Sequence, residues 1–135
     1  MTETSPARPR VRGYSHIGIA VTDLDAARGF YLDLLGCEEL PRPDLGVPGM
    51  WLRVGDLQLH FVETDDMPTH GGGLPHIALH VADADFDPLI GELRGAGVAF
   101  PFEPFHNGEN WAAFVADPAG NMVELTTLGP LAPRG

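Results

Sequence analysis

Two segments of the chain, 60 residues apart, share one pattern of hydrophobic and polar positions. Residues 16–21 and 76–81 both carry branched aliphatic side chains at every second position. A period of two predicts a β-strand with one buried face. The opposite face of each segment carries only small side chains and imidazoles, among them His16 and His76. Such a face is typical of a strand that borders a site, because it offers little for a packed core.

A helix is expected after each of these strands. In the first half, Thr22 or Asp23 can cap a helix whose apolar residues recur at three- and four-residue spacing, and Gly36 ends it. In the second half we expect Asp87 to be the cap, with Pro88 at the first helical position.

Three short strands are predicted after each helix, so that each half has the order β-α-β-β-β. Their expected ranges are 37–40, 50–54 and 57–62 in the first half and 98–100, 111–116 and 121–127 in the second. The fold class is therefore α+β, with two βαβββ modules. We divide the chain into a disordered leader (1–13), a first module (14–63), a linker (64–74), a second module (75–128) and a tail (129–135).

Composition narrows the possible functions. A length of 135 residues allows one compact domain, and a net charge of -11 argues against nucleic acid as a partner. All eight basic residues are arginine, which excludes Schiff-base chemistry and a P-loop lysine. One cysteine cannot build a disulfide framework within the chain. Residues 1–13 are polar and rich in proline, and no apolar run reaches about 18 residues. We expect a soluble cytoplasmic protein with no membrane partner.

Four potential metal ligands occupy equivalent positions in the two halves. His16 and His76 begin the first strands, and His60 and Glu124 follow them by 44 and 48 residues in the last strands. If the first and last strands of each half are neighbours, these four side chains can converge. Three imidazoles and a carboxylate suit one divalent transition metal, such as Zn, Ni, Fe, Mn or Co. The alternative is that each histidine is an ordinary structural residue.

Two further residues bear on the chemistry. His80 lies on the same face of this strand as His76 and is a candidate catalytic base. The alternative is that His80 is an ordinary polar residue at the rim of the cavity. Arg53 is the only arginine that we place on a strand near the site. Anion-binding groups are therefore scarce, which disfavours a multiply phosphorylated substrate or a coenzyme A ester.

The sequence resembles the vicinal oxygen chelate superfamily, which includes glyoxalase I, extradiol dioxygenases, methylmalonyl-CoA epimerase, and fosfomycin- and bleomycin-resistance proteins. The resemblance covers about residues 14–128 and is carried by four segments, 16–24, 30–36, 76–81 and 117–125. It implies a glyoxalase-like fold, in which the modules form a cupped, eight-stranded mixed sheet around one divalent metal. It also implies that the ligands are His16, His60, His76 and Glu124, and that the chain forms a homodimer. The sequence leaves open whether modules pair within a chain or between chains.

The leading function is a glyoxalase-like lyase or isomerase that transfers a proton on a small substrate chelated through vicinal oxygens. Glu124, released from the metal, or His80 would move the proton. Glyoxalase I usually has glutamate where this chain has His60, and the epimerase usually has glutamine. One alternative is an Fe(II) extradiol-type dioxygenase, which uses two histidines and one glutamate. The other is a non-catalytic drug-binding or resistance protein, which generally lacks these ligands.

Overall fold

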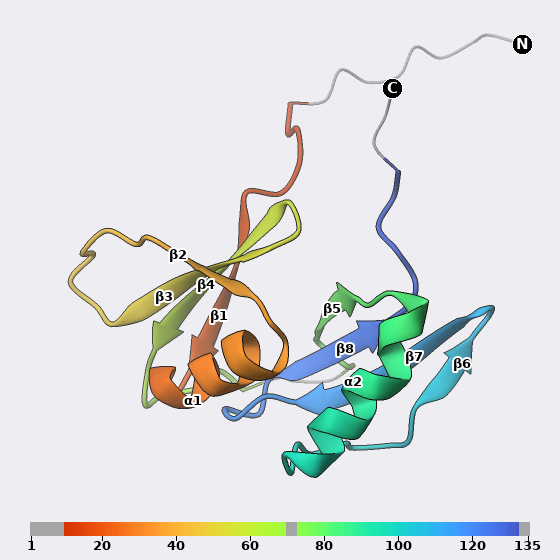
Figure 1. Ribbon diagram of the computed structural model, residues 1–135. Coiled ribbons are helices and arrows are strands. Elements are labelled where there is room, and N and C mark those ends of the chain that lie inside the picture. The colour runs from red at the N-terminus through yellow and green to blue at the C-terminus, as the bar shows by residue number, and fades with distance from the viewer. Residues whose placement is uncertain (1–9, 70–72, 133–135) are drawn as a thin grey trace, which may run out of the picture.

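The computed structural model describes residues 10–69 and 73–132 and contains two four-stranded sheets (Figure 1). Most of the expected leader, residues 70–72 of the expected linker, and residues 133–135 of the expected tail lie outside the described part of the chain. None of the described helices is long and apolar enough to cross a membrane.

The first unit has the predicted β-α-β-β-β order. Its elements are β1 (His16–Val21), α1 (Leu24–Arg28), the π-helical η1 (Gly29–Leu34), β2 (Glu38–Leu40), β3 (Gly49–Val54) and β4 (Leu57–Glu63). The strand order is β1-β4-β3-β2, and β1 runs parallel to β4. The first and last strands are therefore neighbours, which the convergence of the candidate ligands requires.

The second unit repeats this arrangement. Its elements are β5 (Ile77–His80), α2 (Asp83–Gly95), β6 (Phe105–Asn107), β7 (Asn110–Ala116) and β8 (Met122–Thr126). The strand order is β5-β8-β7-β6, with β5 parallel to β8. The predicted α+β class with two βαβββ units is confirmed.

The first helical segment begins where the sequence predicts. The Asp23 carboxylate accepts hydrogen bonds from the backbone N–H groups of Asp25 and Ala26, which have no partner within the helix. The segment changes from α to π geometry at Gly29 and runs to Leu34. Gly36 then leaves the helix with a φ of 76°, a conformation that glycine adopts without steric cost.

The predicted start of the second helix is wrong. The helix α2 begins at Asp83 and contains Pro88, so Asp87 is not its cap. Asp83 and Asp85 lie in the first turn, where negative charge is favourable, and the Asp85 N–H donates to the Ala82 carbonyl at 2.9 Å. These contacts start the helix one turn earlier. The helix tolerates Pro88 although this residue has no backbone N–H to donate.

The strand expected at 98–100 does not form. One backbone hydrogen bond, from Ala116 N–H to the Ala99 carbonyl, reaches this segment from β7. The edge of β7 pairs instead with β6, through a tight hairpin in which Gly108 has a φ of 67°. β6 pairs with residues 110–112 of β7, whereas the 98–100 segment reaches β7 only at Ala116, and a single hydrogen bond there does not make a strand.

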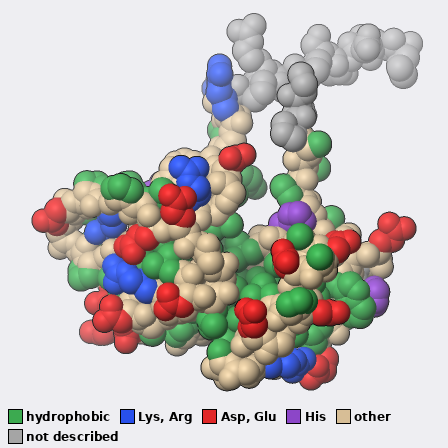
Figure 2. Space-filling model, in the orientation of Figure 1, with side chains coloured by type: hydrophobic (Ala, Val, Ile, Leu, Met, Phe, Trp, Pro, Cys, Tyr) green, Lys and Arg blue, Asp and Glu red, His purple; other side chains and the backbone are tan. Residues whose placement is uncertain are grey.

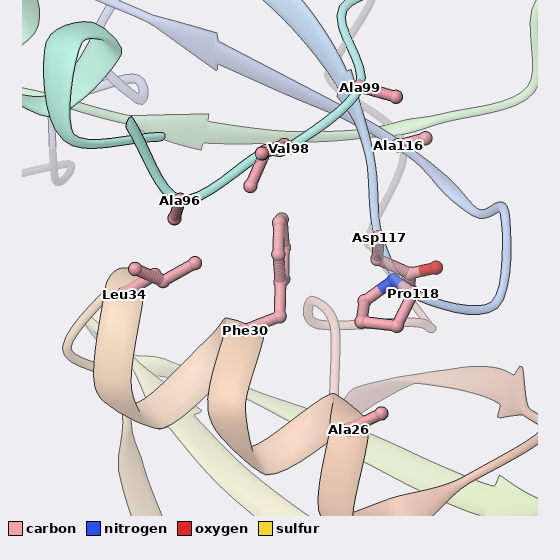
Figure 3. A pocket seen from close by; sticks show the side chains of 10 residues that line it. Ala26, Phe30, Leu34, Ala96, Val98, Ala99, Ala116, Asp117 and Pro118 are labelled. Carbon is pink, nitrogen blue, oxygen red and sulfur yellow. The ribbon is translucent and has the colours of Figure 1, made fainter. Parts of the chain in front are cut away.

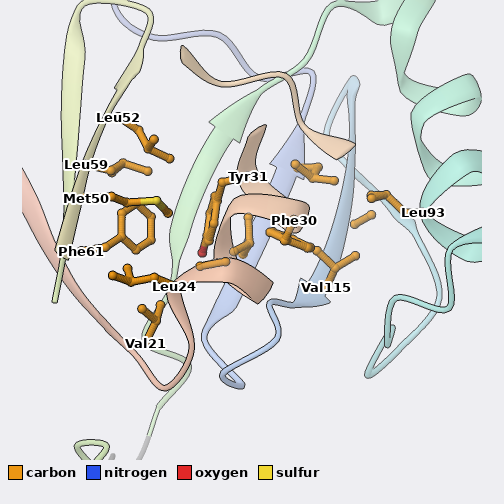
Figure 4. Close-up of a cluster of buried hydrophobic side chains, with 14 of the residues drawn as sticks. Val21, Leu24, Phe30, Tyr31, Met50, Leu52, Leu59, Phe61, Leu93 and Val115 are labelled. Atoms are coloured by element: carbon orange, nitrogen blue, oxygen red, sulfur yellow. The ribbon is translucent and has the colours of Figure 1, made fainter. Parts of the chain in front are cut away.

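One hydrophobic core joins the two units. Figure 4 shows Tyr31 and Phe30 between side chains of the first sheet, such as Phe61, and two residues of the second unit, Leu93 and Val115. The predicted buried faces of the first strands contribute to this core, because Ile17, Ile19, Val21, Ile77 and Leu79 all belong to it or pack against it. The opposite faces of β1 and β5 are left to build the site.

Candidate functional site

Two of the predicted ligands, His16 and His60, lie together on the first sheet. Their rings are stacked, with centroids 3.9 Å apart and planes 14° apart. The register explains this contact, since Gly18 of β1 lies opposite His60 of β4 and His16 is two residues away on the same face. Gly18 has no side chain to separate the two imidazoles.

A tryptophan extends this stack. Trp51 of β3 lies directly opposite His60, with ring centroids 4.0 Å apart and planes 6° apart. On the same strand as His60, Gln58 Oε1 lies 2.9 Å from the His60 Nε2 atom. His60 is thus held between two rings and by one polar contact, so its orientation is defined before any ligand binds.

The surroundings of His60 favour its neutral form. Burial lowers the pKa of His60, and the nearby charges of His16 and Arg42 lower it further. A neutral imidazole is the form that binds metal ions, because the ring nitrogen must offer a lone pair. His60 is therefore available as a ligand at neutral pH.

The other two predicted ligands, His76 and Glu124, lie together on the second unit. His76 Nε2 is 3.0 Å from Glu124 Oε1, and His76 Nδ1 is 2.6 Å from the Leu74 carbonyl oxygen. Because a carbonyl oxygen only accepts, Nδ1 carries the proton, and in the neutral ring Nε2 is then a lone-pair donor facing a carboxylate. Two such groups repel each other unless a proton or a cation lies between them.

This arrangement is typical of a histidine that binds a metal. Metal ligands of this type commonly donate their second ring N–H to a backbone carbonyl, which fixes the tautomer. In His76 the Leu74 carbonyl has that role, so Nε2 and the Glu124 carboxylate, which contact each other at 3.0 Å, could share a bound cation. The donor set therefore fits a divalent transition metal.

Aromatic side chains border this second pair. The Phe114 ring lies 4.9 Å from the His76 ring in an edge-to-face arrangement, and Phe114 is opposite Glu124 in the register of the sheet. Phe102 and Phe105 continue the cluster, with ring centroids 5.2 Å and 6.1 Å from Phe114. Phe102 and Phe105 are partly exposed, so they form an apolar wall beside the polar pair.

The two pairs do not meet within one chain. Among residues 10–69 and 73–132, no group of three or more His, Cys, Asp or Glu side chains lies close enough to hold one metal ion. The first pair belongs to the β1-β4 sheet and the second to the β5-β8 sheet. Each chain therefore offers two candidate half-sites, each with two potential donors.

The third candidate in the second unit, His80, lies at the end of β5, opposite Thr126. His80 is exposed, and its imidazole lies against Gly129, 3.5 Å from where a Cβ of that residue would stand. It is two positions beyond Ala78, which pairs with Glu124, on the same alternating face. His80 thus borders the second half-site without joining the His76–Glu124 pair.

The sequence did not single out Arg42, which lies near the first half-site. A Cβ added at Gly49 would stand 2.8 Å from the Arg42 Cζ atom, so the guanidinium lies against the start of β3. Arg53 lies on β3 opposite Gln58, two residues beyond Trp51, and pairs with Glu38 at 3.3 Å. Arg42 comes from the segment between β2 and β3, and no local sequence pattern indicates which way such a residue faces.

A separate apolar groove lies elsewhere on the molecule. Figure 3 shows it between Phe30 and Leu34 on the first helical segment and Val98 and Pro118 of the second unit. None of the predicted ligands lines it. The groove is part of the contact between the two units and is distinct from the half-sites.

Comparisons with known proteins agree with this architecture. A family model described as "Glyoxalase/Bleomycin resistance protein/Dioxygenase superfamily" matches residues 13–125. Glutathione transferase FosA of Serratia marcescens is 32% identical over 127 residues, covering 92% of this chain and 86% of that protein. Human mitochondrial methylmalonyl-CoA epimerase is 32% identical over 79 residues, covering 50% of this chain and 45% of the epimerase.

Solved structures show the same fold. The fosfomycin resistance protein FosX of Listeria monocytogenes superposes with a TM-score of 0.76 at 23% identity, covering 90% of this chain and 94% of that one. A glyoxalase-family protein from Bacillus anthracis superposes with a TM-score of 0.73 at 25% identity, covering 88% and 97% of the two chains.

Proposed function

This chain belongs to the glyoxalase/bleomycin resistance protein/dioxygenase superfamily, and on that premise we propose that it is a metal-dependent enzyme acting on a small molecule that chelates the metal through vicinal oxygens. The observation that carries the proposal is the His76–Glu124 pair. With His76 Nδ1 committed to the Leu74 carbonyl, Nε2 and the carboxylate present two lone-pair donors 3.0 Å apart.

The proposed ligands of one divalent transition metal are His16, His60, His76 and Glu124. When bound, such a metal polarises the substrate oxygens and stabilises the negative charge that develops on them. His60 contributes a neutral imidazole held by Trp51 and His16. Glu124 contributes the only carboxylate of the set.

We propose that each complete site combines two copies of the chain. His16 and His60 of one protomer would face His76 and Glu124 of the partner subunit, because the two pairs of one chain lie on different sheets. A two-fold axis that brings the pairs together creates two equivalent sites in a homodimer. The sequence left open whether modules pair within a chain or between chains, and we propose that they pair between chains.

The proposed reaction is proton transfer on the chelated substrate, as in a lyase or isomerase. Glu124 is the proposed base: it accepts a proton from the carbon next to the polarised carbonyl and returns it to a neighbouring atom. His80 is the second proposed base, since it borders the same half-site. Phe102, Phe105 and Phe114 form an apolar wall that would exclude water from the reacting carbon.

A second candidate reaction is group transfer to a small oxygen-chelating substrate. One observation favours it, the similarity to glutathione transferase FosA over 92% of this chain. An activity assay distinguishes the two reactions. Transfer consumes one equivalent of glutathione, whereas isomerisation gives a product with the same molecular mass as the substrate. Iron-dependent oxygen uptake with a catechol would instead support an extradiol-type dioxygenase.

Metal content tests the proposal. Elemental mass spectrometry of the purified full chain should find one divalent metal per chain, with clear losses in His60→Ala and in His76→Ala. Absence of metal, with no uptake on reconstitution, would overturn the proposal of a metal-dependent enzyme and support that of a non-catalytic drug-binding protein. Glu124→Gln should keep the fold and abolish turnover.

Mixing two variants tests the shared site. His16→Ala and His76→Ala each spoil every site in their own homodimers. If sites are shared, a heterodimer of the two regains one intact site, so a random one-to-one mixture recovers roughly a quarter of the metal sites. If each site uses a single chain, mixing recovers none. Light scattering on the same samples should give twice the 14.5 kDa mass of one chain.

A further inference from the structure

Arg42 differs from the other arginines of the folded region in having no acidic partner. Between residues 14 and 128 there are four arginines, and Arg28, Arg53 and Arg94 each form an ion pair with Asp or Glu. Arg42 forms none among the residues that the structure describes, although the chain has 19 acidic residues. A cation without an ion-pair partner in so acidic a chain is a candidate group for binding an anionic ligand.

The position of Arg42 connects it to the first half-site. Its Cζ and Nη2 atoms would both stand 2.8 Å from a Cβ at Gly49. Gly49 and Trp51 occupy alternate positions on β3 and so share a face. Trp51 stacks on His60 on that face, and the charge of Arg42 is near enough to help lower the pKa of His60.

The guanidinium is also incompletely satisfied. Its Nε atom is shielded from water and has no hydrogen-bond partner within the described residues. A buried donor without a partner costs free energy, which a bound acceptor recovers. The planar guanidinium presents pairs of N–H groups that match the two oxygens of a carboxylate, phosphonate or phosphate.

We propose that Arg42 binds a negatively charged oxygen group of the substrate, next to the metal ligands His16 and His60. This inference rests on the proposed function and narrows its substrate class to small anions. The acidic side chains visible over the surface in Figure 2 would repel such molecules, so the unpaired Arg42 would set where the anion binds on the folded region. A single clamp accommodates one anionic group, in keeping with the expectation that multiply phosphorylated substrates are disfavoured.

The test uses the full chain in its metal-free form, with inorganic phosphate as the tetrahedral probe and acetate as the planar one. NMR of arginine Nε–H groups follows the binding, and the signal missing in Arg42→Gln identifies Arg42. We expect one of the probes to shift that signal, and Arg42→Gln to weaken its binding by roughly tenfold or more. The probe that binds more tightly distinguishes a phosphonate-like from a carboxylate-like group.

Two variants control the experiment. Arg53→Gln removes an arginine on the face of β3 that carries Gly49 and Trp51. Since Arg53 is already paired with Glu38, this variant should leave binding of the probe unchanged. Arg42→Lys keeps the charge and loses the Nε donor, so it should bind less tightly than the wild type while folding normally. Binding that is equal in Arg42→Gln and the wild type, or an Arg42 signal that neither probe moves, would overturn the proposal.

Metal content of the same variants separates this inference from the proposed function. Arg42→Gln should retain one metal per chain. Loss of probe binding with normal metal content confirms the anion site on a metalloprotein. Probe binding that depends on Arg42 in a protein that takes up no metal would sustain the anion site and overturn the metal-dependent enzyme. Normal metal content together with probe binding that is the same with and without Arg42 would support the metal-dependent enzyme and overturn the anion site.

Discussion

The hydroxyl of Tyr31 donates a hydrogen bond of 2.7 Å to Oδ2 of Asp117 and so ties the first βαβββ unit to the second. Both residues are buried, and burial beside the Asp117 carboxylate raises the pKa of Tyr31, which keeps the phenol protonated as a donor. Asp117 also accepts from the backbone N–H groups of Ala119 and Asn121, and Asn121 Nδ2 reaches back to the Ala20 carbonyl at 2.8 Å. This network fixes how the two sheets sit relative to each other.

Replacement of Tyr31 by phenylalanine should destabilise the protein. The substitution leaves the ring in the core but removes the donor to a buried carboxylate, at a cost of about 1–3 kcal/mol in the free energy of unfolding. Denaturant unfolding followed by circular dichroism measures the change. Tyr14→Phe is the matched control, because Tyr14 is 81% exposed and should show no shift in the midpoint. Equal midpoints for the two variants would contradict a bridging role for Tyr31.

Alanine at Gly49 should be poorly tolerated. Its Cβ would collide with the Phe61 carbonyl oxygen and press on the Arg42 guanidinium, so the strand pair must shift, at about 1–3 kcal/mol. The contrasting variant is Gly91→Ala in α2, where the added methyl group meets open space and should stabilise the helix by about 0.4–1 kcal/mol. Thermal unfolding of the two variants should show shifts of opposite sign.

The local pattern of the sequence contains most of the fold. Period-two runs at 16–21 and 76–81 predict strands with one buried face, and Val21 and Leu79 do join the core or pack against it. The repeat itself pairs His16 with His60 and His76 with Glu124, because equivalent residues on equivalent modules reach equivalent places. Both pairs follow from spacing alone once the first and last strands are neighbours.

What the sequence did not predict depends partly on local signals that compete and partly on contacts between distant residues. The helix α2 starts at Asp83 because acidic residues favour its first turn, whereas the Asp-Pro pair at 87–88 is the stronger local signal. Arg42 lies in the loop between β2 and β3, and its contact with Gly49 is one that no local pattern of residues indicates. The separation of the two pairs onto different sheets likewise depends on the shared core, which no spacing reveals.

The pKa of His60 should lie below the ordinary histidine value of about 6.5. The causes are burial first, then the charges of His16 and Arg42. Since the folded pKa is lowered, the neutral form is favoured in the folded state. Its contribution to stability is full above pH 6.5 and is lost as the pH falls through the folded pKa. Histidine NMR titration of the metal-free protein measures this directly.

Single substitutions identify the charges that act on His60. His16→Ala and Arg42→Gln should each move the titration midpoint of His60 upward, because each removes a positive charge that opposes protonation. Arg53→Gln is the control, as Arg53 already pairs with Glu38 and does not act on His60. A midpoint that stays fixed in both His16→Ala and Arg42→Gln would mean that burial alone sets the pKa.

Trp51 should report metal binding at the first half-site. Its ring lies parallel to that of His60 with centroids 4.0 Å apart, so a Co²⁺ or Ni²⁺ ion bound by His60 comes close to the indole and quenches its fluorescence. The chain has two tryptophans, and the other, Trp111, packs against Phe86 and His106 on the second unit. Trp111→Phe should therefore keep a large quench on metal addition, and Trp51→Phe should lose most of it. If the quench instead follows Trp111, the metal does not bind beside His60, because a bound ion quenches the tryptophan that is nearest to it.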